Sequence, residues 1–155
     1  IACGAAPRVR AARAACGPRP DAPGEAPAEW LARVASSALG ERVLAADAGR
    51  MWAVFDAASL EALGCARLTV RPPQAGDRMV PFGMGGEKLL SDLFTDAKVP
   101  RHARAATPVV ECGGRVLFVG GLRQSALAPV GDGTVEVVVL AVSRDLRNSH
   151  KRGSV

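Results

Sequence analysis

Two stretches of the chain place apolar residues three or four positions apart, the spacing of one face of an α-helix. The first stretch spans 27–39, where a proline suits the first helical position and Gly40 suits the stop. The second spans 87–97 and ends before Pro100, because proline disfavours helical geometry in the residue before it. The apolar stripes are Trp30, Leu31, Val34, Ala35 and Ala38 in the first stretch, and Leu89, Leu90, Leu93, Phe94 and Ala97 in the second.

Short runs rich in β-branched residues predict strands between and after these helices. The candidate strands are 51–55, 67–71, 108–111, 115–119 and 135–142. The third and fourth flank Gly113 and Gly114, which predicts a β-hairpin. Asp56 is the expected N-cap of a short helical turn, since its carboxylate can accept hydrogen bonds from free backbone N–H groups.

These elements predict a small α+β domain with a largely antiparallel sheet of three or four strands. The helix at 87–97 is expected to cover one face of that sheet, and the helix at 27–39 precedes it. We divide the chain into a flexible N-terminal segment (1–26), a helical and short-strand lead-in (27–60), the main domain (61–143) and a basic tail (144–155). The first segment is rich in Ala, Pro, Gly and Arg without apolar periodicity.

The net charge of +5 suggests a polyanionic partner, but its distribution weakens that inference. Residues 1–20 carry +4 and residues 144–155 carry +3, which leaves −2 for residues 21–143. A nucleic-acid surface must therefore rest on local clustering of cations. No run of about 18 apolar residues is present, so no membrane-spanning helix is expected.

The four cysteines show no metal-ligand spacing, and no C-x-x-C motif is present. Cys65 and Cys112 are expected to be small buried hydrophobic residues rather than a redox pair. Cys3 and Cys16 fall in the segment expected to be flexible. A reducing cytoplasm is the expected location.

The stretch 76–104, GDRMVPFGMGGEKLLSDLFTDAKVPRHAR, organises the rest of the chain. It resembles the C-terminal domain of the tRNA(Ile)-lysidine synthetase family, in which a GDR turn precedes P-x-G-M-x-G, K-x-L-S-D-x-F-x-D and K-V-P-x-x-x-R. The resemblance extends over about 54–123. The matching residues are Gly76, Asp77, Arg78, Pro81, Gly83, Met84, Gly86, Lys88, Leu89, Ser91, Asp92, Phe94, Asp96, Lys98, Val99, Pro100, Arg101 and Arg104.

The resemblance implies tRNA contact and a chain without catalytic residues of its own. The family joins lysine to the wobble cytidine of an isoleucine tRNA, using ATP and magnesium in a catalytic domain whose SGGxDS loop has no counterpart here. The implied partners are tRNA and that catalytic domain, with a homodimer also considered. The residues carried over for tRNA contact are Arg71, Arg78, Lys88, Lys98, Arg101, Arg104 and Arg123.

The residues themselves leave alternatives open for these candidate sites. The cations are either a phosphate clamp or solvated charge balanced by Asp77, Asp92 and Asp96. Gly85 and Gly86 either present backbone N–H groups to a phosphate at a helix N-terminus or form a tight turn without ligand. Asp77 is expected to fix the turn.

Asp92 and Asp96, at i and i+4, are expected to form a solvated face with Lys88 rather than a catalytic or metal-binding pair. His102 either contacts RNA or is exposed without a role. Phe82, Phe94 and Phe118 are expected in the core and not as stacking platforms for bases. No metal site is expected.

The residues and the resemblance leave two functions open. The chain is either a tRNA-binding module, or a docking domain that packs on a catalytic domain or self-associates without contacting RNA. In either case it is expected to be inactive alone.

Overall fold

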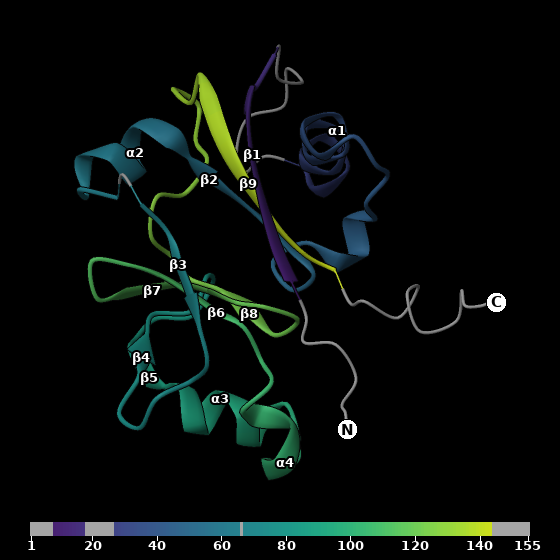
Figure 1. The fold of residues 1–155 in the computed structure, drawn as a ribbon. Coiled ribbons are helices and arrows are strands. Elements are labelled where there is room, and N and C mark those ends of the chain that lie inside the picture. Colours follow the sequence, from purple (N-terminus) through teal and green to yellow (C-terminus); the bar gives the residue numbers. More distant parts are fainter. Residues whose placement is uncertain (1–7, 18–26, 66, 144–155) are drawn as a thin grey trace, which may run out of the picture.

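The computed structural model describes residues 8–17, 27–65 and 67–143. Its elements form four layers, with a helix, two antiparallel sheets and a second helical layer (Figure 1). The predicted α+β class with a mostly antiparallel sheet is confirmed. A second sheet, which the strand pattern did not predict, lies between the predicted sheet and α1.

The first sheet has the strand order β1-β9-β2, with β1 at Arg8–Ala15, β9 at Glu136–Ser143 and β2 at Trp52–Asp56. The expectation of a flexible N-terminal segment is therefore wrong for residues 8–15, while 1–7 and 18–26 lie outside the described residues. Composition misled here because β1 has only small side chains and arginines. Pairing with the apolar β9, not intrinsic propensity, holds it.

Helix α1 (Ala28–Leu39) covers the outer face of this sheet. Pro27 is its N-cap, and Gly40 ends it with a φ of 73°, in the left-handed region that glycine tolerates. A 3-10 turn, η1 (Ala45–Asp47), leads into β2, and α2 (Ala57–Ala62) follows β2 directly. Asp56 caps α2 as predicted, since its carboxylate accepts a hydrogen bond from the Ala58 N–H at 3.2 Å.

The second sheet has the order β3-β6-β7-β8. Its strands are β3 (Thr69–Arg71), β6 (Val109–Cys112), β7 (Arg115–Val119) and β8 (Arg123–Gln124). The predicted hairpin is β6–β7, where Gly113 and Gly114 turn the chain with φ values of 56° and 83°.

The motif stretch crosses the outer face of the second sheet as a small ribbon followed by two helices (Figure 1). Its elements are β4 (Arg78–Met79), β5 (Lys88–Leu89), α3 (Leu90–Asp96) and α4 (Arg101–Arg104). The predicted helix therefore starts at Leu90 rather than at residue 87, because Lys88 and Leu89 pair with β4 instead.

Three apolar clusters separate the layers. Between α1 and the first sheet lie Trp52 and Val54, and between the two sheets lie Ala53 and Phe55, as the alternation of side chains along a strand requires. The third cluster packs α3 on the second sheet. It contains Met79, Leu90, Leu93, Phe94, Val109, Val116 and Val119.

Cys65 and Cys112 form a disulfide with a Cα–Cα distance of 5.4 Å. The expectation of two unlinked hydrophobic residues is therefore wrong, although Cys112 is buried as predicted. The two positions are 47 residues apart in sequence, and only the pairing of β3 with β6 brings them together. Within the described ranges, no helix is long and apolar enough to cross a membrane.

Candidate nucleic-acid interface

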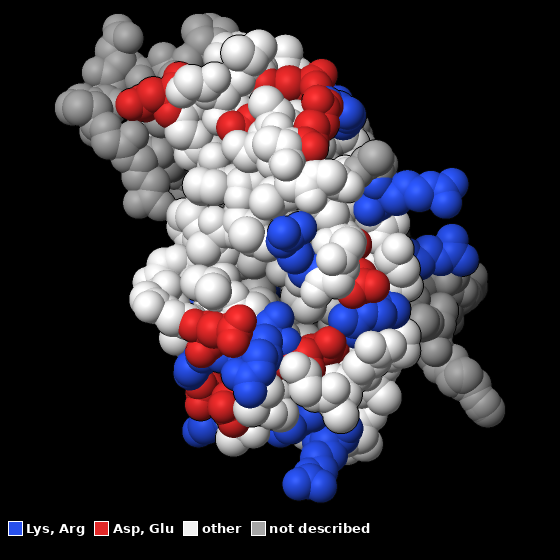
Figure 2. Space-filling model, turned by 90° about the vertical axis from the view of Figure 1, so that its left-hand side faces the viewer, with Lys and Arg blue, Asp and Glu red and all other residues white. Residues whose placement is uncertain are grey.

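Charged side chains gather around the second sheet and its helices. On the face drawn in Figure 2, lysines and arginines occupy mainly the middle and lower parts, and acidic side chains lie between them. Which cations are available to a ligand therefore depends on which carboxylates already hold them. The seven predicted contact residues divide on this criterion.

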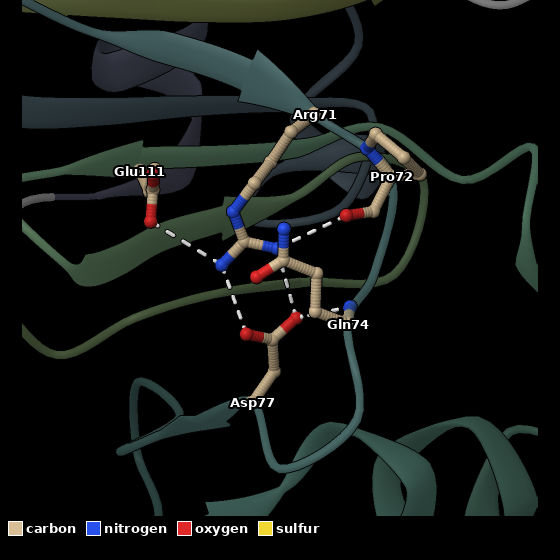
Figure 3. Close-up of polar contacts among 5 residues, drawn as sticks. All are labelled: Arg71, Pro72, Gln74, Asp77 and Glu111. Carbon is tan, nitrogen blue, oxygen red and sulfur yellow. Dashed lines mark hydrogen bonds and ion pairs between the residues drawn. The ribbon is translucent and has the colours of Figure 1, made fainter.

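Arg71 is held inside the protein. Its guanidinium donates two hydrogen bonds to the Asp77 carboxylate, both at 2.9 Å, one to Glu111 at 3.3 Å and one to the Pro72 carbonyl at 3.0 Å (Figure 3). Asp77 also accepts a 2.7 Å hydrogen bond from the Gln74 N–H. The Arg71 side chain is only 13% exposed. Its guanidinium N–H groups therefore connect β3 and β6 to the turn before β4.

This arrangement lowers the pKa of Asp77, first through the hydrogen bonds from Arg71, against the opposing effect of burial. The same hydrogen bonds raise the pKa of Arg71. Both groups are therefore charged throughout the physiological range. The structural role predicted for Asp77 is confirmed, and Arg71 takes the same role in place of an open RNA contact.

Two further cations of the set are paired on the surface. Lys88 Nζ lies 2.7 Å from Asp96, and Arg78 lies 3.5 Å from Glu87. The contact with Asp96 agrees with the expected charged face of Lys88, Asp92 and Asp96, although Lys88 reaches it from β5 and not from the helix. Surface pairs of this kind contribute little to stability, so a phosphate can compete for both cations.

Arg104 folds back onto α3. Its Nε donates to the Val99 carbonyl at 3.0 Å, and its guanidinium lies 5.5 Å from the centre of the Phe94 ring. A weaker contact of 3.4 Å reaches Thr95. Arg104 thus helps to close the turn between α3 and α4.

The remaining three predicted residues, Lys98, Arg101 and Arg123, are exposed, and no ion pair or side-chain hydrogen bond joins any of them to another residue of the described ranges. Lys98 follows α3 with a φ of 58°, a left-handed conformation that ordinary residues rarely adopt. There its N–H donates to the Thr95 carbonyl at 3.0 Å, closing the helix end.

A surface hollow joins this helix end to β8. Asp96, Ala97 and Val99 line it from α3 and the following turn, and Arg123 and Arg50 line it from the opposite side. Arg50 was not among the predicted residues. It lies far before β8 in sequence, and tertiary contacts place it here, among them a 2.8 Å hydrogen bond from the Gly121 N–H to its carbonyl.

Gly85 and Gly86 lie in an exposed bend before β5, not at a helix N-terminus. The first turn of α3 begins beyond β5, where the Leu90 N–H already donates to the Asp77 carbonyl at 2.9 Å. The dipole of α3 therefore does not favour a phosphate at these two glycines.

The remaining candidate residues lie either on the surface or in the core. Asp92 and His102 are exposed, and no group of residues within the described part of the chain could hold a metal ion. Phe94 and Phe118 are in the core as predicted. Phe82 is not, since 42% of it is exposed, and it lies beside Gln124 of β8. His150 and the basic tail lie outside the described residues.

Comparison with known proteins gives this surface a context. Residues 68–141 match the family model described as TilS substrate C-terminal domain. The chain is 40% identical over 105 residues to the tRNA(Ile)-lysidine synthase of Geobacillus kaustophilus, and 38% identical over 71 residues to that of Persephonella marina. These alignments cover 67% and 46% of this chain, but only 22% and 16% of those proteins.

Solved structures agree with these relatives. A crystal structure of a TilS C-terminal domain superposes with a TM-score of 0.62 and 29% identity, covering 90% of this chain and 85% of that one. An N-terminal fragment of the phenylalanyl-tRNA synthetase β-subunit from Pyrococcus horikoshii shares the fold, with a TM-score of 0.58 and 17% identity. Through residues 68–141, the chain therefore belongs to the family of the tRNA(Ile)-lysidine synthase C-terminal domain.

Proposed function

We propose that this chain binds tRNA through phosphate contacts at the surface around the end of α3, and that it carries no catalytic activity by itself. In the full reaction, lysine joins the wobble cytidine of an isoleucine tRNA. We assign that step, with its ATP and magnesium, to a catalytic domain that works together with this one. The cytoplasm is the location that this role implies.

The observation that carries the proposal is that three of the seven predicted contact residues, Lys98, Arg101 and Arg123, are exposed and have no side-chain partner within the described ranges. Arg123 lines the hollow at the end of α3, whose other wall includes the residues on either side of Lys98. Exposed cations that no carboxylate neutralises are the groups that release counterions when they meet a phosphate backbone. Arg78 and Lys88 extend the set, because their exposed ion pairs are weak.

The strained backbone at Lys98 supports the same proposal. A helix end with positive φ is most often occupied by glycine, and a lysine there carries a conformational cost. A lysine at this strained position is consistent with a function of its ammonium group, and we propose that this function is to bind a phosphate.

The test is the triple charge reversal Lys98→Glu, Arg101→Glu and Arg123→Glu, measured by fluorescence anisotropy with tRNA at several salt concentrations. We expect the affinity to fall by at least about tenfold and the slope of log K against log salt to become shallower by about one per lost phosphate contact. The matched control reverses Arg33, Arg42 and Arg67, three exposed arginines that do not line the hollow at the end of α3, and should retain most of the binding.

Two results would overturn the proposal. One is an affinity that does not depend on salt, and the other is equal loss in the control and in the triple variant. Either result would favour the alternative of a docking domain that packs on its catalytic partner or on a second copy, without touching RNA.

A further inference from the structure

Phe82 is an exposed aromatic residue in a rigid setting. Its N–H donates to the Gln124 carbonyl at 2.9 Å, and two residues earlier the Val80 carbonyl accepts from the Ala126 N–H at 2.8 Å. The segment 80–82 therefore runs along β8 like an added strand, with a bridge between Pro81 and Ser125. A backbone fixed at both ends holds the ring in place without burying it.

The ring lines a hollow of about 280 Å³, together with Gly49, Arg50, Arg123 and Gln124. Pockets for drug-sized ligands measure roughly 300–1,000 Å³, so this hollow, at the small end of that range, suits one planar group. None of the residues that line it is acidic. Arg123 is without a partner in the described chain, and Arg50 makes two long contacts, one of 3.4 Å with the Asp47 carboxylate and one of 3.5 Å with the Ala46 carbonyl.

Gln124 adds a fixed hydrogen-bond acceptor. Its Nε2 donates to the Val54 carbonyl at 3.0 Å, which determines the orientation of the amide. The Oε1 atom then faces Gly49, since a Cβ atom added to that glycine would lie 3.8 Å from it. The hollow therefore offers an aromatic face, two guanidinium groups and one carbonyl oxygen that can accept from a base N–H.

We propose that this hollow binds one unpaired nucleotide of the RNA. Its base stacks on Phe82 and donates to Gln124 Oε1, and its phosphates lie against Arg50 and Arg123. Stacking platforms flanked by cations are how proteins hold single-stranded nucleotides. The inference rests on the proposed function, since it names the part of the RNA that this end of the cationic surface receives.

The experiment uses the full chain and three RNA stem-loops with the same stem. One is blunt, one carries a four-nucleotide 3′ extension, and one carries the same extension with abasic riboses, which keeps the phosphates and removes the bases. Anisotropy should show the base-bearing extension binding about five- to tenfold more tightly than the abasic one, as stacking of one base predicts. Phe82→Ala should abolish this difference, and Phe82→Trp should restore it.

Val70→Ala is the matched control, because Val70 is an apolar residue that is 51% exposed on β3, outside the hollow. It should keep the preference for bases. Equal binding of the base-bearing and abasic RNAs by the unaltered protein would overturn the inference, and so would a Phe82→Ala effect of the same size on the blunt RNA.

The same measurements separate the inference from the proposed function. If all three RNAs bind with salt-dependent affinity but without a preference for bases, the result supports the proposed phosphate surface and contradicts the stacking site. If none of the three RNAs binds, both the proposed function and the stacking site are contradicted. A Phe82 variant that loses association with the catalytic domain while RNA binding is unchanged would assign the hollow to a protein partner instead.

Discussion

At the residue scale, the seven predicted contact residues differ in what holds their side chains, not in their charge. Arg71 has its donors directed at two carboxylates and a carbonyl, whereas Lys98, Arg101 and Arg123 have no such partners in the described chain. The first therefore contributes to the free energy of unfolding and the others are available to a ligand. A count of basic residues in the sequence treats them as equivalent.

Replacing Asp77 by Asn tests the internal ion pair. The change leaves Arg71 nearly buried beside a neutral amide, so we expect a loss of about 3 kcal/mol in the free energy of unfolding at pH 7. Urea unfolding monitored by circular dichroism measures it. RNA affinity at low denaturant should change little, and a large loss of affinity in a folded variant would contradict the structural role.

The pH dependence of that difference follows from the sign of the pKa shift. The pKa of Asp77 is lowered in the folded protein, so the folded state favours the ionised form. Its contribution is complete above the ordinary carboxyl pKa of about 4 and is lost as the pH falls through the lower folded value. The stability difference between the two proteins should therefore shrink below about pH 4, and a difference that grows there would contradict it.

At the scale of elements, α3 is short because its neighbours on both sides compete for the chain. Lys88 and Leu89 pair with β4 at one end, and the left-handed Lys98 closes the other. The Val99 N–H then donates to the Phe94 carbonyl at 2.9 Å, which completes a common helix-ending motif. Pro100 ensures that α4 starts as a separate helix.

Lys98→Gly separates stability from binding at this helix end. Glycine relieves the positive φ, so we expect the free energy of unfolding to stay equal or to rise by up to about 1 kcal/mol. The same change removes one partner-free cation, and RNA affinity at low salt should fall with a shallower salt slope. Thermal unfolding and anisotropy on one preparation check both. A variant that is less stable and binds equally well would contradict the assignment.

In the whole molecule, the last strand, β9, lies at the centre of the first sheet between β1 and β2. Every residue of β1 pairs with β9, and Arg13 contacts Glu136 of β9 and Glu61 of α2. The positive charge that the sequence concentrates at residues 8–15 is therefore partly neutralised by folding. The cationic character of the surface around α3 is local and does not come from the N-terminal arginines.

The Cys65–Cys112 disulfide connects the segment after α2 to the end of β6, an inner strand of the second sheet. A bond that closes a loop of this length restricts the unfolded chain, and its reduction should lower the free energy of unfolding by about 2–4 kcal/mol. Unfolding with and without dithiothreitol measures the change. Cys65→Ser with Cys112→Ser should reproduce the reduced value. A stability that does not respond to reductant would contradict the bond, as would two titratable thiols at these positions in the untreated protein.

The cytoplasmic location stays a prediction, and this disulfide bears on it. Reducing compartments disfavour structural disulfides. The thiol titration therefore also shows whether the two cysteines are bonded or reduced in the protein as it comes from cells, and so bears on the compartment.

Short-range signals in the chain were enough to locate the local elements and to indicate the family. Apolar spacing located α1 and the core face of α3, Asp56 and Gly40 marked helix ends, and the glycine pair marked the β6–β7 hairpin. These signals are short-range, since capping, turn geometry and helical periodicity depend on residues a few positions apart. The contiguous motif from Gly76 to Arg104 carried the resemblance for the same reason.

Which residues are accessible to a ligand depends on the folded arrangement of the chain. The β1–β9 pairing, the disulfide, the position of Arg50 and the exposure of Phe82 all depend on segments that are distant in sequence. Such contacts arise from the packing of both sheets, which leaves no periodic trace in the chain. The same packing took Arg71 out of the candidate surface and left Lys98, Arg101 and Arg123 exposed, because the carboxylates from the turn before β4 and from β6 reach only the first.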